Sequence, residues 1–425
     1  MTSKRALAAL VGVAAVIGLA GMVQGGEFFF KDGDVVVVLG DSITEQHLYS
    51  SYLEAWTVCR FPTWKITFRN VGIGGDTSPG GESRFKRDVL FRKPTALTVD
   101  FGMNDGGYGA FNQQGYDRYV RGLEGIAQQA KGANIRVAWL TPSPFERKED
   151  GPAAEGYNQT LERFSEGVKE VAAANDGLFI DQLHPYIAAM DKARAAKAAN
   201  RIGGGDAVHP GPPGQALMAW AILKGMNFPN LVVSADIDAA AGKAAGTQGC
   251  KITGLKAAAG GVQFQQQDEG LPFSPAEAKS ILQWAPVLED LNEYRLKVTG
   301  LKAGQYEIRL GGKKVAQYSD GDLSTGVNLT AAVLADGPIA EQVHTVWSAL
   351  TAKNAFHHDR IFRGIVLSPV NVPDWLDLKL TPQQIESQRQ AAIEKRLAEL
   401  TKYDEALRKA LVIVPHEVQI VPVQK

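Results

Sequence analysis

The sequence predicts a doubly wound α/β domain, in which helices cover both faces of a parallel sheet. Five short runs rich in β-branched and aromatic residues alternate with helix-compatible segments, which is typical of such a sheet. The first run, VVVVL, is apolar at every position, as expected of a strand that is buried on both faces. The predicted strands are residues 35–39, 64–70, 96–101, 135–140 and 177–180.

The chain is longer than this domain requires. At 425 residues it can hold one catalytic-sized domain and appended structure. We expect the α/β domain at 27–232 and an accessory region at 233–425.

The formal net charge is -1 and no Lys/Arg cluster is dense enough to follow a phosphate backbone, so nucleic acid is not an expected partner.

The N-terminus has the pattern of a secretory signal peptide. Lys4 and Arg5 precede an apolar run at 6–23, and small residues follow at Gly25 and Gly26. We therefore expect a signal peptide at 1–26 and an exported protein, periplasmic or extracellular. The run is long for a signal peptide, so an uncleaved membrane anchor stays open as the alternative.

Two cysteines, Cys59 and Cys250, are present in the whole chain. In an oxidising compartment they could pair, and the sequence alone does not decide this. The oligomeric state is also left open.

Polar and glycine-rich segments follow the predicted strands. In doubly wound sheets the ligand crevice lies beyond the carboxyl ends of the strands, so these segments are the ones to inspect. Each alone has an ordinary explanation as a turn, a helix cap or a surface loop. Together, after successive strands, they indicate a functional site. They are Gly40 to Ser42, Asn70 to Thr77, Gly102 to Asp105 and Gly203 to Pro210.

These four segments, read as GDSITE, NVGIGGDTS, GMND and DAVHP, resemble the four motif blocks of the SGNH/GDSL hydrolases. The resemblance covers about residues 35–224. It implies a flavodoxin-like three-layer α/β/α fold and ester hydrolysis by a serine nucleophile. Carried over to this chain, the resemblance implies Ser42 as the nucleophile, His209 as the base, Asp206 as the orienting acid, and Ser42, Gly75 and Asn104 as oxyanion donors. The third block has Met103 where many members have a second glycine.

The chemistry requires these residue types. A serine hydroxyl is a weak nucleophile at neutral pH and needs a base within hydrogen-bond reach, and histidine titrates in the right range. An acid three residues before the histidine can orient the imidazole from the same loop. The carbonyl that is attacked develops negative charge, which N–H donors from other strand ends can stabilise.

A second segment, Asp181-Gln182-Leu183-His184-Pro185, has the same acid and histidine spacing and also follows a predicted strand. We favour Asp206 and His209, because glycines precede them and a helix at 214–224 follows. The resemblance to this family implies that Asp181 is simply the residue at the end of the fifth strand.

No cofactor is expected. The seven histidines are scattered, and their only adjacent pair, His357 and His358, has no ligand-spaced partners, which argues against a metal site. We interpret this pair as the polar end of a helix. The glycines at 72–75 lack the lysine of a nucleotide-binding loop.

The accessory region is expected to contain three parts. Residues 235–261 are rich in Ala and Gly and are interpreted as a linker or irregular excursion. Runs at 294–298 and 306–310, with a hairpin through Gly311 and Gly312 to 313–318, indicate a small antiparallel β unit. Helices are predicted at 338–355 and 382–411, the second with an apolar stripe that should dock on the protein's own core. This region either stabilises the α/β domain or shapes glycan binding.

The sequence thus predicts an exported serine ester hydrolase acting on small-molecule or polysaccharide esters, with O-acetyl groups on carbohydrates as the leading substrate. A lipid acyl hydrolase is the next candidate. A non-catalytic glycan-binding relative is the alternative from another class, although all the motif residues are present.

Overall fold

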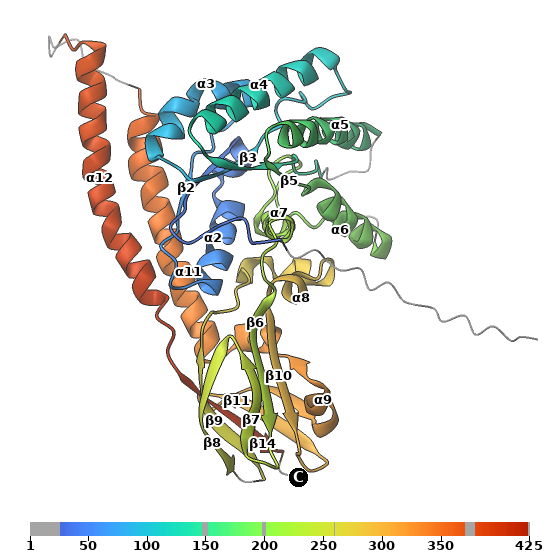
Figure 1. The fold of residues 1–425 in the computed structure, drawn as a ribbon. Helices are drawn as coiled ribbons and strands as arrows, with labels where there is room; N and C mark the ends of the chain where they lie inside the picture. The colour runs from blue at the N-terminus through green and yellow to red at the C-terminus, as the bar shows by residue number, and fades with distance from the viewer. Residues whose placement is uncertain (1–25, 147–151, 198–200, 259, 370–378, 424–425) are drawn as a thin grey trace, which may run out of the picture.

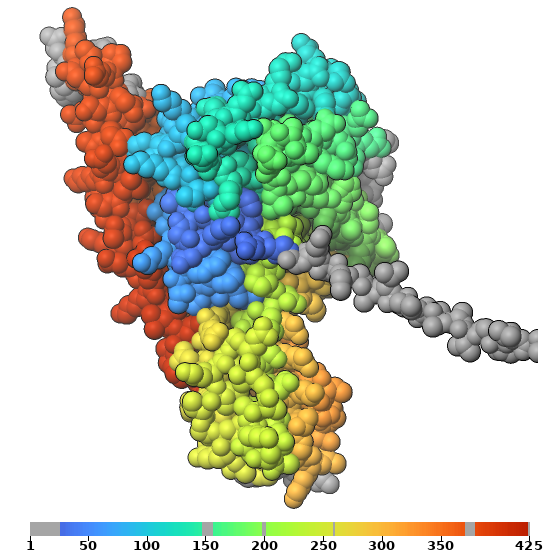
Figure 2. Space-filling view, in the orientation of Figure 1, coloured from blue at the N-terminus to red at the C-terminus, as the bar shows by residue number. Residues whose placement is uncertain are grey.

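The computed structural model describes residues 26–146, 152–197, 201–258, 260–369 and 379–423. The chain forms an α/β region, a β-rich region beyond it, and two long helices that run along the side of the α/β region (Figure 1). Figure 2 shows the same arrangement on the surface, where the helix α12 (Pro382–Ala410), coloured red, lies against the blue and cyan α/β region.

The α/β region is built on a parallel five-stranded sheet in the order β2-β1-β3-β4-β5. This is the flavodoxin-like order, so the predicted fold class is confirmed. All five strands predicted from the sequence are present. They are β1 (Val35–Gly40), β2 (Thr67–Asn70), β3 (Ala96–Asp100), β4 (Arg136–Leu140) and β5 (Leu178–Ile180).

Helices cover both faces of the sheet. Alternate residues of β1 point to opposite faces: Val36 and Val38 pack in one buried cluster with α2 and α7, and Val37 and Leu39 pack in a second cluster with α3 and α4. The helical elements are α1 (Ser42–Glu45), α2 (Leu48–Arg60), α3 (Ser78–Asp88), η1 (Leu90–Arg92), α4 (Gln113–Gly132), α5 (Pro152–Ala174), α6 (Leu183–Ala196) and α7 (Pro212–Gly225).

The expected linker at 235–261 is wrong, because this segment forms strands. In β6 (Leu231–Asp238), Val233, Ala235 and Ile237 are buried on one side, so small residues here serve a packed strand. The following strand β7 (Lys243–Gln248) is exposed along its length. The Ala and Gly content of this segment is therefore compatible with strands and does not mark a linker.

The β-rich region is also larger than expected, since it contains two sheets. One has the order β13-β10-β6-β7 and the other β12-β11-β14-β9-β8. The runs at 294–298 and 306–310 lie in different sheets, and β10 pairs in parallel with β6. The remaining elements are β8 (Cys250–Ala258), β9 (Gly261–Asp268), η2 (Ala276–Gln283), α8 (Val287–Leu291), β10 (Glu293–Thr299), β11 (Gln305–Leu310), β12 (Lys313–Ser319), α9 (Asp320–Thr325), β13 (Val327–Asn328), α10 (Thr330–Ala335) and β14 (His416–Pro422).

Two long helices join the regions, namely α11 (Pro338–Phe356) and α12 (Pro382–Ala410). The apolar stripe of α12 docks on the protein's own core, as predicted: Ile393 and Leu400 lie in the cluster of the second sheet face, and Leu407 lies in the first. The two predicted helices are therefore confirmed.

The interpretation of the histidine pair as the polar end of a helix is wrong. α11 continues directly into a π-helix, η3 (His357–Val366), and His357 is buried. The ring of His358 lies 4.4 Å from that of His47, at the start of α2. The pair therefore packs the C-terminal helices against the α/β region.

Cys59 and Cys250 are both buried free thiols, so they do not pair in this structure. Within the described ranges no helix combines the length and hydropathy needed to cross a bilayer. Residues 1–25 of the expected signal peptide lie outside those ranges.

Candidate active site

Segments far apart in the sequence meet at the carboxyl end of the sheet. The Ser42 hydroxyl lies 2.8 Å from His209 Nε2. The second motif block is tied to the end of β1 by a hydrogen bond of 3.2 Å from the Ile73 N–H to the Gly40 carbonyl. The Asn104 side-chain amide donates to the Asp76 carbonyl at 2.8 Å. All four motif blocks are thereby joined at one rim.

Ser42 is presented by a sharp turn between β1 and α1. A Cβ at Gly40 would lie 2.1 Å from Thr44 Oγ1, so only glycine lets the helix fold back on the strand end. The Asp41 carboxylate caps the helix by accepting the Ile43 N–H at 2.9 Å. Ser42 is therefore the first helical residue after a rigid buried strand.

A buried arginine holds this turn. Arg84 on α3 donates from Nη2 to the Gly40 carbonyl at 3.0 Å and from Nη1 to the Val71 carbonyl at 2.6 Å. Its Nε also pairs with the Asp76 carboxylate at 2.7 Å. One guanidinium thus fixes the ends of two strands and the loop that carries Gly75.

The His209 ring lies between Ser42 and Asp206. Its Nδ1 is 3.0 Å from an oxygen of the Asp206 carboxylate. An ionised carboxylate only accepts hydrogen bonds, so Nδ1 carries the proton and Nε2 presents its lone pair to the Ser42 hydroxyl. This tautomer allows the imidazole to take a proton from the serine.

Hydrogen bonds within the loop set the charge of Asp206. Its partial burial acts to raise the pKa, but the backbone N–H and ring of His209 and the Val208 N–H all donate to the carboxylate. These hydrogen bonds outweigh the effect of burial and hold the pKa of Asp206 below its usual value. Asp206 is therefore ionised at neutral pH, although its side chain is 66% exposed.

The loop that carries His209 depends on its glycines and on a buried acid. A Cβ at Gly205 would lie 1.9 Å from the His209 carbonyl oxygen. The Glu146 carboxylate accepts the N–H groups of Ile202 and Gly203 at 2.9 and 2.7 Å. The loop is thereby folded tightly and anchored to the segment after β4.

The three N–H donors that the sequence predicts for the oxyanion belong to motif blocks joined at this rim. The backbone N–H groups of Ser42 and Gly75 donate to no acceptor within the part of the chain that the structure describes. The Asn104 amide uses one N–H on the Asp76 carbonyl and keeps the second. Gly75 has φ +73 and a Cβ there would meet no atom within 4 Å, so the conformation rather than space requires glycine.

Buried carboxyl groups lie beneath the site. Burial raises the pKa of Asp100, at the end of β3, to about 7. Burial also raises the pKa of Asp105 to about 6, against the effect of hydrogen bonds from Ser78 and Gly102. Asp105 thus connects the third motif block to the start of α3.

The second acid and histidine pair lies on the surface, away from the serine. His184 is 53% exposed and its two ring nitrogens contact the carboxylates of Asp181 and Glu162, at 2.7 and 2.9 Å. Burial acts to lower the pKa of His184, but these carboxylates outweigh it and raise the pKa. Its ring therefore has no free nitrogen for Ser42.

Sequence reasoning missed several residues that hold the site, among them Arg84, Glu146 and Gln215. Gln215 accepts the Tyr49 N–H at 2.9 Å and donates to the side chain of Gln46 at 2.6 Å. The sequence did contain a signal for Gln215, because it is a glutamine within a largely apolar helix. Nothing in the sequence distinguishes Arg84 from the other basic residues of its helix.

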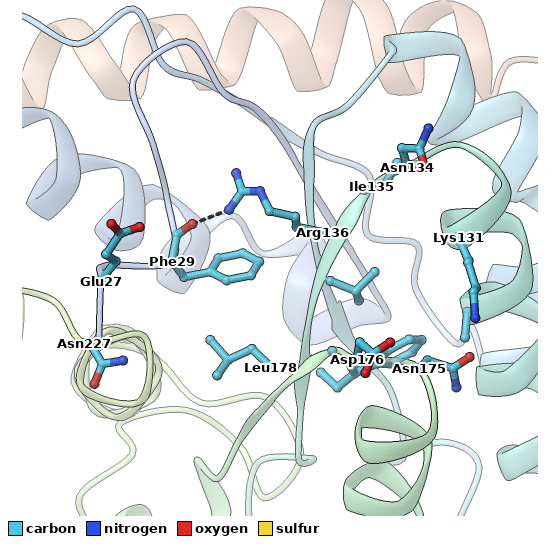
Figure 3. Close-up of a pocket in the computed structure, with 14 residues that line it drawn as sticks. Glu27, Phe29, Lys131, Asn134, Ile135, Arg136, Asn175, Asp176, Leu178 and Asn227 are labelled. Carbon is cyan, nitrogen blue, oxygen red and sulfur yellow. Dashed lines mark hydrogen bonds between the residues drawn. The ribbon is translucent and has the colours of Figure 1, made fainter. Parts of the chain in front are cut away.

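A cavity of about 620 Å³ lies at the opposite end of the sheet, around the starts of β4 and β5 (Figure 3). Arg136 crosses it to donate to the Phe29 carbonyl. None of its lining residues belongs to the four motif blocks. Among the described residues, no group of three or more His, Cys, Asp and Glu side chains is arranged to hold a metal ion.

Residues 38–217 match the model of the GDSL-like lipase/acylhydrolase family. This part of the chain is a GDSL-like lipase/acylhydrolase domain. The match supports an acylhydrolase or esterase activity for this domain. An acetylxylan esterase from Geobacillus stearothermophilus is 24% identical over 221 residues, which cover 46% of this chain and 95% of that protein.

The solved structure of a gut microbial diltiazem-metabolizing enzyme resembles nearly the whole chain. Its TM-score is 0.79 at 24% identity, and the likeness covers 93% of this chain and 98% of that one. The fold of the α/β region and that of the C-terminal regions thus occur together in another protein.

Proposed function

We propose that this GDSL-like protein is an exported serine esterase that removes O-acetyl or other short acyl groups from carbohydrates. The observation that carries the proposal is the hydrogen-bonded chain from the Ser42 hydroxyl through His209 to Asp206. Export rests on the N-terminal pattern of Lys4, Arg5 and the apolar run after them.

In the proposed reaction, His209 Nε2 takes the proton of the Ser42 hydroxyl as the serine oxygen attacks the ester carbonyl. The N–H groups of Ser42, Gly75 and Asn104 stabilise the resulting oxyanion. His209 then gives its proton to the departing alcohol, and an acyl-serine remains. Water, activated by the same imidazole, releases the acid and restores the serine.

Two features support a carbohydrate ester as substrate. The acetylxylan esterase is a relative of this domain. The side chains of Tyr108, Asp206 and His209 are 47%, 66% and 37% exposed, so the described rim is open to solvent beside the nucleophile. An open rim admits an ester whose alcohol part is large and extends into solvent.

Hydrolysis of p-nitrophenyl acetate by the wild type and by Ser42→Ala tests the nucleophile. We expect the variant to lose activity while its thermal unfolding midpoint is retained. Equal turnover by both proteins would reject catalysis at this serine and would favour a glycan-binding relative.

A substrate panel tests the second part of the proposal. We expect acetylated xylo-oligosaccharides to be hydrolysed with a higher kcat/KM than lysophospholipids or long-chain p-nitrophenyl esters. A preference that rises with acyl chain length would instead identify a lipid acyl hydrolase.

A further inference from the structure

Tyr108 occupies an unusual place in the loop between β3 and α4. Its backbone φ is +59, a value that few residues other than glycine adopt, and its side chain is 47% exposed. The loop is held in place at both sides, because the Gly106 N–H donates to the Gly102 carbonyl and Thr160 donates to the Gly109 carbonyl. A strained residue that the surrounding structure maintains in this way is a candidate for a functional role.

The Tyr108 hydroxyl fixes the side chain of Asn104. It donates to Asn104 Oδ1 at 2.5 Å, while Asn104 Nδ2 donates to the Asp76 carbonyl at 2.8 Å. A carbonyl can only accept, so the amide nitrogen must face Asp76 and the amide oxygen must face Tyr108. The amide is therefore held at both ends, and its second N–H keeps one direction.

The Tyr108 ring belongs to a row of aromatic side chains along the rim. Its centroid is 5.5 Å from that of Tyr157, whose ring lies edge-on to Phe145 at 5.5 Å. The N–H of Glu146, next in the chain, donates to the Ala207 carbonyl in the loop that carries His209. The row thus extends from the Asn104 loop to the His209 loop.

Electrostatics also place Tyr108 among the acids of the site. Burial raises the pKa of its phenol, and the Asp41 and Asp206 carboxylates raise it further. The hydroxyl therefore stays protonated and remains a hydrogen-bond donor at neutral pH.

We propose that Tyr108 is a positioning residue for the Asn104 amide, and that its exposed ring is the surface on which a sugar ring of the substrate's alcohol part stacks. This inference rests on the proposed function, since it assigns the partner of the oxyanion donor and the place of the carbohydrate. A tyrosine suits both tasks, because it offers a flat apolar face and one polar end.

The hydroxyl is tested by Tyr108→Phe, which keeps the ring. With ethyl acetate as substrate we expect kcat to fall about 3-fold to 10-fold, the effect of one lost neutral hydrogen bond, and KM to stay unchanged. In the Asn104→Ala background the same substitution should have no further effect on kcat. An equal fall in both backgrounds, or no fall in the wild-type background, would overturn the positioning role.

The ring is tested by comparing Tyr108→Ala with Tyr108→Phe on two substrates. For an acetylated xylo-oligosaccharide, we expect Tyr108→Ala to raise KM about 10-fold, the effect of about 1.4 kcal/mol of lost binding, and Tyr108→Phe to leave it unchanged. For ethyl acetate, which has no ring, KM should be the same in both variants. A rise in KM on both substrates, or on neither, would overturn the stacking role.

Tyr116→Phe is the matched control, because Tyr116 lies near the same loop on α4 but packs against Phe111 and Phe164 instead of the motif residues. Its kinetics should equal those of the wild type, and unfolding midpoints verify that each variant is folded.

The esterase proposal and the positioning proposal would be rejected by different results. An active Ser42→Ala variant rejects the esterase proposal itself, whereas an inactive Ser42→Ala with a fully active Tyr108→Phe rejects only the positioning role.

Discussion

The Ser42 oxygen and the His209 Nε2 nitrogen lie 2.8 Å apart, although 167 positions separate them in the sequence. The sheet produces this contact, since β1 delivers the serine and the loop before α7 delivers the histidine to the same rim. His184 has the same local sequence pattern but is engaged by two carboxylates on the surface.

This difference between the histidines gives a paired prediction. We expect His209→Ala to lower kcat by about 10⁴-fold to 10⁶-fold, because His209 is the proposed base for Ser42. His184→Ala should leave kcat close to the wild-type value. Turnover of p-nitrophenyl acetate measures both, and the reverse pattern would overturn the assignment of the base.

The proposed oxyanion donor Asn104 gives a second prediction. Asn104→Ala should lower kcat by roughly 10²-fold to 10³-fold with little change in KM, since the donor acts on charge that develops in the transition state. Steady-state kinetics on p-nitrophenyl acetate measure this. A change confined to KM would show that Asn104 binds the substrate without stabilising the oxyanion.

Asp100 makes stability depend on pH in a defined direction. Burial raises its pKa to about 7, whereas an aspartate in the unfolded chain has a pKa of about 3.9. Below about pH 4 both states hold the proton, so the buried carboxyl contributes its full stability there. As the pH rises to about 7 the unfolded state ionises first, and the free energy of unfolding falls.

Asp100→Asn removes this dependence, because an amide stays neutral and its oxygen can still accept from Gln182 Nε2, which lies 3.2 Å from the carboxylate. We expect the variant to be more stable than the wild type at pH 8 and similar to it at pH 4. Urea unfolding at both pH values measures the difference. A difference that does not change with pH would contradict the buried, protonated carboxyl.

A buried ion pair joins the GDSL-like domain to the C-terminal helices. Lys353 on α11 contacts the Glu54 carboxylate on α2, and the two side chains are 2% and 1% exposed. Asn354 donates to the other oxygen of Glu54 at 3.0 Å. The pair therefore lies in the interface between α2 and α11.

Lys353→Met should destabilise the protein by about 3–5 kcal/mol, because it leaves the Glu54 charge buried and unpaired. Lys313→Met is the matched control, since Lys313 pairs with Asp336 and Glu341 on the surface, and its unfolding midpoint should hardly change. Thermal unfolding compares them. Equally small changes in the unfolding midpoints of the two variants would mean that water reaches Glu54.

The sequence predicted the parts of this structure that depend on local pattern. The apolar run of β1 and the segments after β2 and β3 were sufficient to predict a parallel sheet with polar loops at one rim. The apolar stripe of α12 was sufficient to predict that it docks on the core. These features are a continuous apolar run, the polar segments that follow strands, and a stripe at helical spacing, all of which are local in the sequence.

The parts that the sequence did not predict depend on contacts between distant residues. β7 has no buried side chain to mark it, and its pairing with β6 decides that it is a strand. Arg84 contacts Gly40, Val71 and Asp76, which are far apart in the sequence and are brought together by the folded sheet. Tyr108, which donates a hydrogen bond to Asn104, has a left-handed backbone that no motif encodes.

Covalent labelling tests the nucleophile most directly. The protein is incubated with a fluorophosphonate that reacts with activated serines, and the adduct is located by tandem mass spectrometry of its peptides. We expect one adduct per chain, on Ser42, and no adduct in Ser42→Ala or His209→Ala. An adduct on another serine, with esterase activity retained in Ser42→Ala, would contradict the assignment of Ser42 as the nucleophile.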